Sequence, residues 1–286
     1  MTLPEAIEFM RPSVVQILVE VRLPPTQIAG GIQMPQRPQQ APLGTGFFVS
    51  ADGYAITARH VIQAFRNIQT AGNKRLMVGV ALPNLENATL TVRGNFTLTE
   101  CDVIDEDSRH DLALLKLKQN PLKGDVGAFM KVGDKVMDIP RRVATPSTAR
   151  PQDGEAIAVS GYPFSSTVLV TTSGNLASSW SYETEEVQIP GAPAWFTRPD
   201  VADSYLGDIH VNPGNSGGPI YTVAEGKVIG VCVSFDMAPV VYGDGNHEPA
   251  STGNRPLYYN SGLANIVPLR YVTELLSKNN LKWEAR

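Results

Sequence analysis

The first half of the chain alternates short apolar runs with polar, turn-forming segments. β-branched and partly alternating residues fill 14–22, and a second apolar run covers 44–50. A proline- and glutamine-rich stretch at 23–42 separates them, so the pattern predicts a strand, a long, exposed, irregular loop and a second strand. Asp52 and Gly53 then stand between two apolar runs, which is typical of a β-hairpin turn.

The rest of the chain continues the β pattern, with helices at three places. Helical spacing predicts helices over 3–11, 58–65 and 267–276, the last of them closing the chain. A polar, proline-containing segment at 141–153 separates two sets of strands. This spacing favours an all-β barrel architecture in two tandem units over βαβ units. The further strands are predicted at 76–82, 88–93, 100–104, 112–117, 155–160, 168–173, 186–189, 218–222, 228–234 and 262–266.

Length, charge and hydropathy exclude several function classes. The 286 residues correspond to about two domain-sized units. A net charge of −4 without a basic cluster argues against nucleic-acid binding. The longest apolar run, 228–235, is too short to span a membrane, and the first residues lack a signal-peptide pattern. We therefore expect a cytoplasmic protein in which Cys101 and Cys232 are free thiols.

Three segments combine a reactive side chain with the residues that acyl transfer requires. They are Thr57-Ala-Arg-His60, His110-Asp111 before an apolar strand, and Asn212-Pro-Gly-Asn-Ser216-Gly-Gly. A serine nucleophile needs a base near neutral pH and a carboxylate that holds the base in one tautomer. Ser216, His60 and Asp111 supply one of each, and the glycines around Ser216 allow a sharp turn that frees backbone amides for an oxyanion.

These segments resemble the trypsin-like (chymotrypsin-fold) serine proteases, and more narrowly the bacterial HtrA/Deg branch. The resemblance rests on GTGFFVSADGYAITARHVI, DLALLKL and VNPGNSGGPI, which occur in that order. It implies a single peptidase domain over 1–286, with an N-terminal six-stranded β-barrel at 12–140, a C-terminal one at 141–266 and a closing helix at 267–279. Many HtrA members also carry a PDZ domain, but the sequence stops soon after the closing helix, so we expect none in this chain.

The resemblance further implies roles for individual residues. It assigns the oxyanion hole to the backbone amides of Gly214 and Ser216. The substrate pocket would be walled by residues just before the serine and in the strand after it, namely His210, Val211, Val233, Ser234 and Phe235. His210 stands where trypsin-type members have an aspartate, so a lysine or arginine side chain would find no carboxylate partner. Val211, Val233 and Phe235 instead suggest a pocket of limited depth for Val, Ile, Leu or Ala. An alternative is that His210 selects an acidic side chain.

The resulting prediction is a serine endopeptidase acting on proteins or peptides through His60, Asp111 and Ser216. The alternative is a catalytically silent module that keeps the fold and binds peptides in its cleft. The His and Cys spacing fits no metal site, and no cofactor is expected. In the resembling family the loop corresponding to 23–42 takes part in oligomer contacts, so homo-oligomerisation through that loop is a further expectation.

Overall fold

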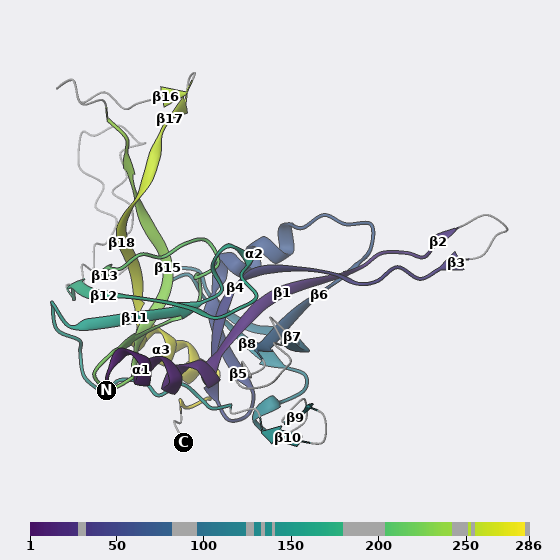
Figure 1. Ribbon diagram of the computed structural model, residues 1–286, viewed down its shortest axis with the longest axis horizontal. Coiled ribbons are helices and arrows are strands. Elements are labelled where there is room, and N and C mark those ends of the chain that lie inside the picture. The colour runs from purple at the N-terminus through teal and green to yellow at the C-terminus, as the bar shows by residue number, and fades with distance from the viewer. Residues whose placement is uncertain are drawn as a thin grey trace.

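Two closed β-barrels, packed side by side, make up the body of the computed structural model (Figure 1). The structure describes residues 1–27, 33–81, 96–123, 129–132, 135–138, 141–179, 204–241, 251–252 and 255–283. The expectation of an all-β fold with two six-stranded barrels and a C-terminal helix is confirmed.

The N-terminal barrel closes in the strand order β1-β4-β5-β8-β7-β6. Its strands have apolar residues on both faces, as the run Leu112–Leu117 illustrates. Ala113, Leu115 and Leu117 point into the barrel core, whereas Leu112 and Leu114 pack towards the other barrel. The strands are β1 (Val14–Arg22), β4 (Gln39–Ser50), β5 (Tyr54–Ala58), β6 (Asn73–Ala81), β7 (Phe96–Asp107) and β8 (Leu112–Leu117).

The C-terminal barrel closes in the order β11-β12-β13-β18-β15-β14. Its interior is a separate apolar cluster that includes Ile157, Ile220 and Ile266. The strands are β11 (Ala156–Gly161), β12 (Val170–Ser178), β13 (Tyr205–Asp208), β14 (Pro219–Thr222), β15 (Val228–Pro239) and β18 (Tyr258–Pro268).

A third apolar cluster joins the two barrels and the terminal helices. Phe47 of the first barrel and Tyr221 of the second are both fully buried in it, together with Met10 and Val272 from the terminal helices. Close packing of these apolar side chains fixes the position of one barrel relative to the other, and a cleft of defined shape between the barrels requires this. The helices are α1 (Leu3–Met10), α2 (Arg59–Asn67) and α3 (Leu269–Lys278), with short 3-10 turns η1 (Arg11–Ser13), η2 (Pro121–Lys123) and η3 (Pro163–Ser165).

The segment 23–42 is more regular than the sequence predicts. Its described residues, 23–27 and 33–42, are largely exposed, as expected, but the β1–β4 ladder runs on to the pair Val21 and Gln39. Pro42 is accommodated beside a register shift in this ladder, where a missing N–H is tolerated. Figure 1 shows the result as a two-stranded arm that leaves the N-terminal barrel. Its outer part contains the short strands β2 (Thr26–Gln27) and β3 (Gln33–Met34).

A second arm leaves the C-terminal barrel, formed by the outer halves of β15 and β18 (Figure 1). The sequence pattern predicted these strands only at 228–234 and 262–266, and it did not predict β13. The predicted strands at 88–93 and 186–189 lie outside the described residues. The remaining short strands are β9 (Phe129–Val132), β10 (Lys135–Asp138), β16 (Ser251–Thr252) and β17 (Arg255–Pro256).

Candidate active site

Pairing of β5 with β8 brings His60 and Asp111 together. In this ladder Ala58 lies opposite Leu112, so the residues that follow β5 meet those that precede β8. The N–H of Arg59 donates to the carbonyl oxygen of Asp111 at 2.8 Å, so the end of β5 and the start of β8 stay hydrogen-bonded. His60 is therefore in the first turn of α2, beside the carboxylate of Asp111.

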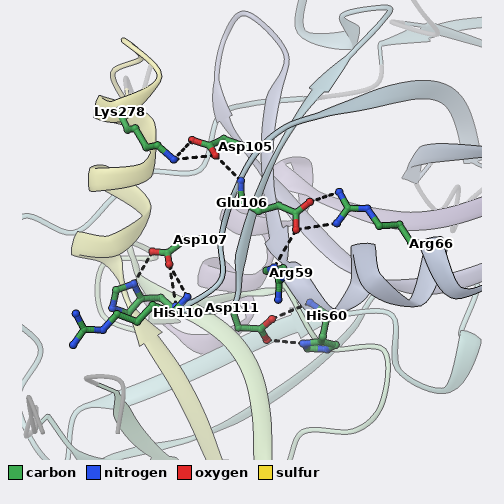
Figure 2. Close-up of polar contacts among 10 residues, drawn as sticks. Arg59, His60, Arg66, Asp105, Glu106, Asp107, His110, Asp111 and Lys278 are labelled. Carbon is green, nitrogen blue, oxygen red and sulfur yellow. Dashed lines mark hydrogen bonds and ion pairs between the residues drawn. The ribbon is translucent and has the colours of Figure 1, made fainter. Parts of the chain in front are cut away.

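Two hydrogen bonds join these residues (Figure 2). The backbone N–H of His60 donates to Asp111 Oδ1 at 2.8 Å, and His60 Nδ1 lies 2.6 Å from Asp111 Oδ2. A carboxylate at this position holds the proton on Nδ1 and leaves Nε2 free to accept one. Asp111 has a φ of +55°, which is unfavourable for a residue with a side chain. Such backbone strain is retained where the surrounding contacts enforce it, and it is frequent at functional sites.

A second Asp–His pair holds the turn that leads into Asp111. Asp107 Oδ1 accepts the backbone N–H groups of Arg109 and His110, while His110 Nδ1 lies 2.6 Å from Asp107 Oδ2. The imidazole of His110 stacks on Tyr271 of α3 with 3.4 Å between ring centroids. Burial opposes ionisation of Asp107, but the hydrogen bonds from His110 outweigh it and lower the pKa of the carboxyl. Sequence reasoning assigned no role to this pair.

Exposure distinguishes the two Asp–His pairs. The side chain of His60 is 41% exposed, whereas that of His110 is 10% exposed and covered by Tyr271. A substrate can therefore reach only the imidazole of His60. The pair His110 and Asp107 is suited to holding the backbone conformation of the turn.

Ion pairs brace both ends of this region (Figure 2). Glu106 accepts from Arg59 Nε at 3.0 Å and from both terminal nitrogens of Arg66, which ties the first and last turns of α2 to β7. Lys278 of α3 pairs with Asp105 of β7 at 2.8 Å. The Glu106 contacts fix α2, and with it His60, against the first barrel, and the Lys278 contact fixes α3 against the same strand.

The loop around Ser216 belongs to the second barrel but is attached to the first. The N–H of Thr45 in β4 donates to the carbonyl oxygen of Ser216 at 2.9 Å, and Thr45 Oγ1 donates to the carbonyl oxygen of Gly214 at 2.6 Å. Gly217, with a φ of +84°, packs so closely on the first barrel that a Cβ would lie 2.7 Å from the backbone nitrogen of Ala58. Because Ala58 leads directly into α2, the Ser216 loop lies beside the start of the helix that carries His60. No sequence signal singled out Thr45.

The amides of this loop fall into two groups. Those of Asn215, Gly217 and Gly218 donate to carbonyl oxygens of Asn212, Cys232 and Asn215, respectively. Those of Gly214 and Ser216 donate to no acceptor among the described residues. Gly214 has a φ of +105°, and a Cβ there would lie 2.4 Å from the carbonyl oxygen of Tyr162. Two unused donors two residues apart in one tight loop are what an oxyanion site needs.

A cavity of about 270 Å³ opens beside Ser216. Four of the five residues predicted for the substrate pocket line it, and the fifth, His210, does not. His210 is exposed, and its carbonyl oxygen accepts from Thr172 Oγ1 at 2.7 Å. No charged side chain lines the cavity among the described residues. Its lining consists of Val211, Asn212, Pro213, Ser216, Cys232, Val233, Ser234, Phe235 and Met237, of which Asn212, Pro213, Cys232 and Met237 were not among the predicted pocket residues.

Both cysteines are buried and free, one in each barrel. Burial raises the pKa of the Cys232 thiol to about 12, and it raises the pKa of Cys101 as well, so both thiols are protonated at neutral pH. A buried, protonated thiol is a poor nucleophile. Within the described ranges, no group of three or more His, Cys, Asp or Glu residues could hold a metal ion.

Comparisons with known proteins give relatives that are named as serine endoproteases. Two relatives are each named "probable periplasmic serine endoprotease DegP-like". The one from Marinomonas sp. (strain MWYL1) is 28% identical over 197 residues, covering 69% of this chain and 30% of the relative. The one from Pseudomonas putida (strain GB-1) is 25% identical over 251 residues, covering 79% of this chain and 41% of the relative. The chain thus spans less than half the length of these relatives.

Solved structures show the same fold. The HtrA-type protease AlgW with a decapeptide superimposes with a TM-score of 0.58 at 16% identity, covering 97% of this chain and 67% of that one. An inactive form of Rv3671c from M. tuberculosis gives a TM-score of 0.50 at 18% identity, covering 96% of this chain and 89% of that one.

One prediction is wrong. The periplasmic names of the relatives contradict the cytoplasmic location that we expected. That expectation rested on the lack of a signal-peptide pattern in the first residues, and the two unpaired thiols agreed with it. Both thiols are enclosed by the barrel cores, so they need no reducing compartment. No helix in the described part of the chain is long and apolar enough to cross a membrane.

A family model described as a trypsin-like peptidase domain matches residues 44–231, from β4 of the first barrel to β15 of the second. This match includes the positions of His60, Asp111 and Ser216. The chain therefore belongs to the family of trypsin-like peptidases.

Proposed function

We propose that the chain is a serine endopeptidase in which Ser216 is the nucleophile, His60 the general base and Asp111 the residue that orients the base. The observation that carries this proposal is the attachment of the Ser216 loop to the barrel that holds the exposed His60–Asp111 pair. Nucleophile, base and orienting carboxylate then border one cleft, as acyl transfer by serine requires.

The chemistry follows from these positions. Ser216 Oγ attacks the carbonyl carbon of the scissile bond, and its proton passes to His60 Nε2 while Asp111 stabilises the imidazolium. The oxyanion of the tetrahedral intermediate accepts hydrogen bonds from the amides of Gly214 and Ser216. His60 then protonates the leaving amine, and water hydrolyses the acyl-enzyme by the same steps in reverse order. Ser216 Oγ makes no hydrogen bond to a described residue, and in unliganded sites the bond to the base often tightens only when substrate binds.

We further propose that the cavity beside Ser216 holds the side chain that precedes the scissile bond. Its uncharged lining favours apolar side chains of moderate size, such as those of Val, Ile, Leu and Ala. Lysine or arginine would lose hydration there without gaining a carboxylate partner. The exposed position of His210, outside this lining, argues against selection of acidic side chains by that residue.

The names of the relatives support a periplasmic location and protein substrates for this chain. We propose both on that basis.

A fluorophosphonate probe tests the function directly, because it reacts covalently with an activated serine. We expect labelling of the wild-type protein and none of the Ser216→Ala variant, whose turnover should fall by about 10⁶-fold. Circular dichroism of both proteins is the control, and the spectrum of the variant should match that of the wild type. Absence of labelling in folded wild-type protein would instead support the catalytically silent peptide-binding module.

A further inference from the structure

The arm formed by β15 and β18 carries an apolar surface that the proposed chemistry does not use. Met237, Tyr258 and Tyr259 are each about half exposed, although they are large apolar or aromatic residues. The arm leaves the body of the barrel, as Figure 1 shows. Exposed apolar side chains that gather on one face of a protein often mark a binding site, so the face on which each of these residues lies decides what the arm can bind.

The register of the two strands shows on which face of the arm each residue lies. Met237 lies opposite Asn260 and Pro239 lies opposite Tyr258, whereas Ala238 lies opposite Tyr259. Residues that face each other in an antiparallel ladder project to the same side, and successive residues alternate. Met237, Pro239 and Tyr258 therefore share one face of the arm, and Tyr259 is on the other.

The face with Met237 is continuous with the cavity beside Ser216. Met237 itself lines that cavity, together with Val211. Asn260, on the same face, donates from Nδ2 to the carbonyl oxygen of Val211 at 2.7 Å, which anchors the arm at the edge of the cavity. The face with Tyr258 thus extends the cavity outward along the arm.

One edge of β15 is also available along this path. On one edge, β15 pairs with β14 only at Val228, Gly230 and Val231. Its other edge pairs with β18, so beyond Val231 the described strands pair with β15 on the β18 edge alone. The unpaired backbone groups from Val233 to Pro239 can accept an extended peptide as an added strand. That stretch is about 20 Å long, which is room for about six peptide residues.

We propose that the outer part of this arm binds an uncharged, apolar, extended segment of the substrate, N-terminal to the scissile bond and beyond the residues at the cavity. This inference rests on the proposed function. The cavity holds the residue before the scissile bond, so chain that continues away from Ser216 along β15 must be the N-terminal side of the substrate. Asp236 is the one charged residue of the stretch from Val233 to Pro239, and its Oδ1 accepts from Asn265 Nδ2 at 2.8 Å. The outer arm residues 237–241 and 257–261 include no charged side chain, which favours an apolar segment over a charged one.

Neighbouring tyrosines provide a matched pair of variants. Tyr258 is 52% exposed and Tyr259 is 54% exposed, they are adjacent in β18, and only Tyr258 faces the cavity side. We would compare Tyr258→Ser with Tyr259→Ser on two fluorogenic peptides that share the same three residues before the scissile bond. The longer peptide carries five additional apolar residues at its N-terminal side.

We expect wild type and Tyr259→Ser to have a higher kcat/KM for the longer peptide than for the shorter one. In Tyr258→Ser this preference should fall about fivefold, with the shorter peptide cleaved as in wild type. Equal behaviour of the two variants, or no preference for length in wild type, would overturn the inference while leaving the proposed function intact.

A binding measurement makes the test independent of turnover. Fluorescence anisotropy measures the affinity of the labelled longer peptide for the inactive Ser216→Ala protein. The double variant that also carries Tyr258→Ser should bind the peptide more weakly, and the double variant that also carries Tyr259→Ser should bind it with unchanged affinity. Light scattering gives the molecular mass of each variant in solution. If Tyr258→Ser lowers this mass and leaves the peptide affinity unchanged, the face binds a second copy of the chain, and the substrate role is refuted.

Discussion

Replacing Asp111 by asparagine removes the charge beside His60 and keeps the shape of the side chain. Because the backbone N–H of His60 can only donate, the amide oxygen must stay at the Oδ1 position, 2.8 Å away. The amide nitrogen then faces Nδ1, where Oδ2 now lies at 2.6 Å, and it can only donate. Nδ1 must therefore accept, which moves the ring proton to Nε2 and blocks proton transfer from Ser216.

We expect Asp111→Asn to lower turnover by about 10⁴-fold, equivalent to about 5 kcal/mol of lost transition-state stabilisation. The assay is kcat on a fluorogenic peptide with an apolar residue before the scissile bond. Nitrogen NMR of the imidazole shows which nitrogen of His60 carries the proton. A variant that keeps more than a tenth of wild-type turnover, or keeps the proton on Nδ1, would refute this reasoning.

The second Asp–His pair supplies the control for this experiment. Asp107 and His110 have the same 2.6 Å contact, but Tyr271 covers the imidazole of His110. Asp107→Asn should therefore lower turnover by at most about tenfold, through the conformation of the turn alone. A loss comparable to that of Asp111→Asn would contradict the assignment of His60, rather than His110, as the general base.

Three further predictions concern stability and reactivity. Gly217→Ala should destabilise the fold by about 3 kcal/mol in denaturant unfolding, because its Cβ would lie 2.2 Å from the carbonyl oxygen of Thr45 and φ is +84°; unchanged stability would disprove the close packing of the loop. Cys101 and Cys232 should react with a thiol reagent at neutral pH only after unfolding, since burial keeps both thiols protonated; rapid reaction of the folded protein would contradict this. The lowered pKa of Asp107 means that its contribution to stability is present above the unfolded-state pKa of about 3.9 and is lost as the pH falls through the lower folded-state value. The difference in Tm between wild type and Asp107→Asn should therefore shrink as the pH falls below about 4, and a difference that grows there would contradict the assignment.

Local patterns predicted much of the scaffold because they depend on near neighbours in sequence. The apolar run at 112–117 and the Asp52-Gly53 turn identified a strand and a hairpin that the structure contains. The helix over 58–65 is present as α2, shifted by one residue at its start. By contrast, 23–42 has the composition of a loop, and only its pairing across β1 makes part of it a strand.

The sequence by itself determined the barrel architecture and singled out His60, Asp111 and Ser216 as the residues with the appropriate chemistry. The tertiary structure decided how these positions are held and what surrounds them. The hydrogen bonds of Thr45 to the Ser216 loop and the stacking of His110 on Tyr271 join residues more than 150 positions apart in sequence. The face that Tyr258 presents depends on its register against Pro239 across the arm. Such contacts arise only when distant segments pack together, because the partner that satisfies a hydrogen bond or covers a ring is absent from the local pattern of residues.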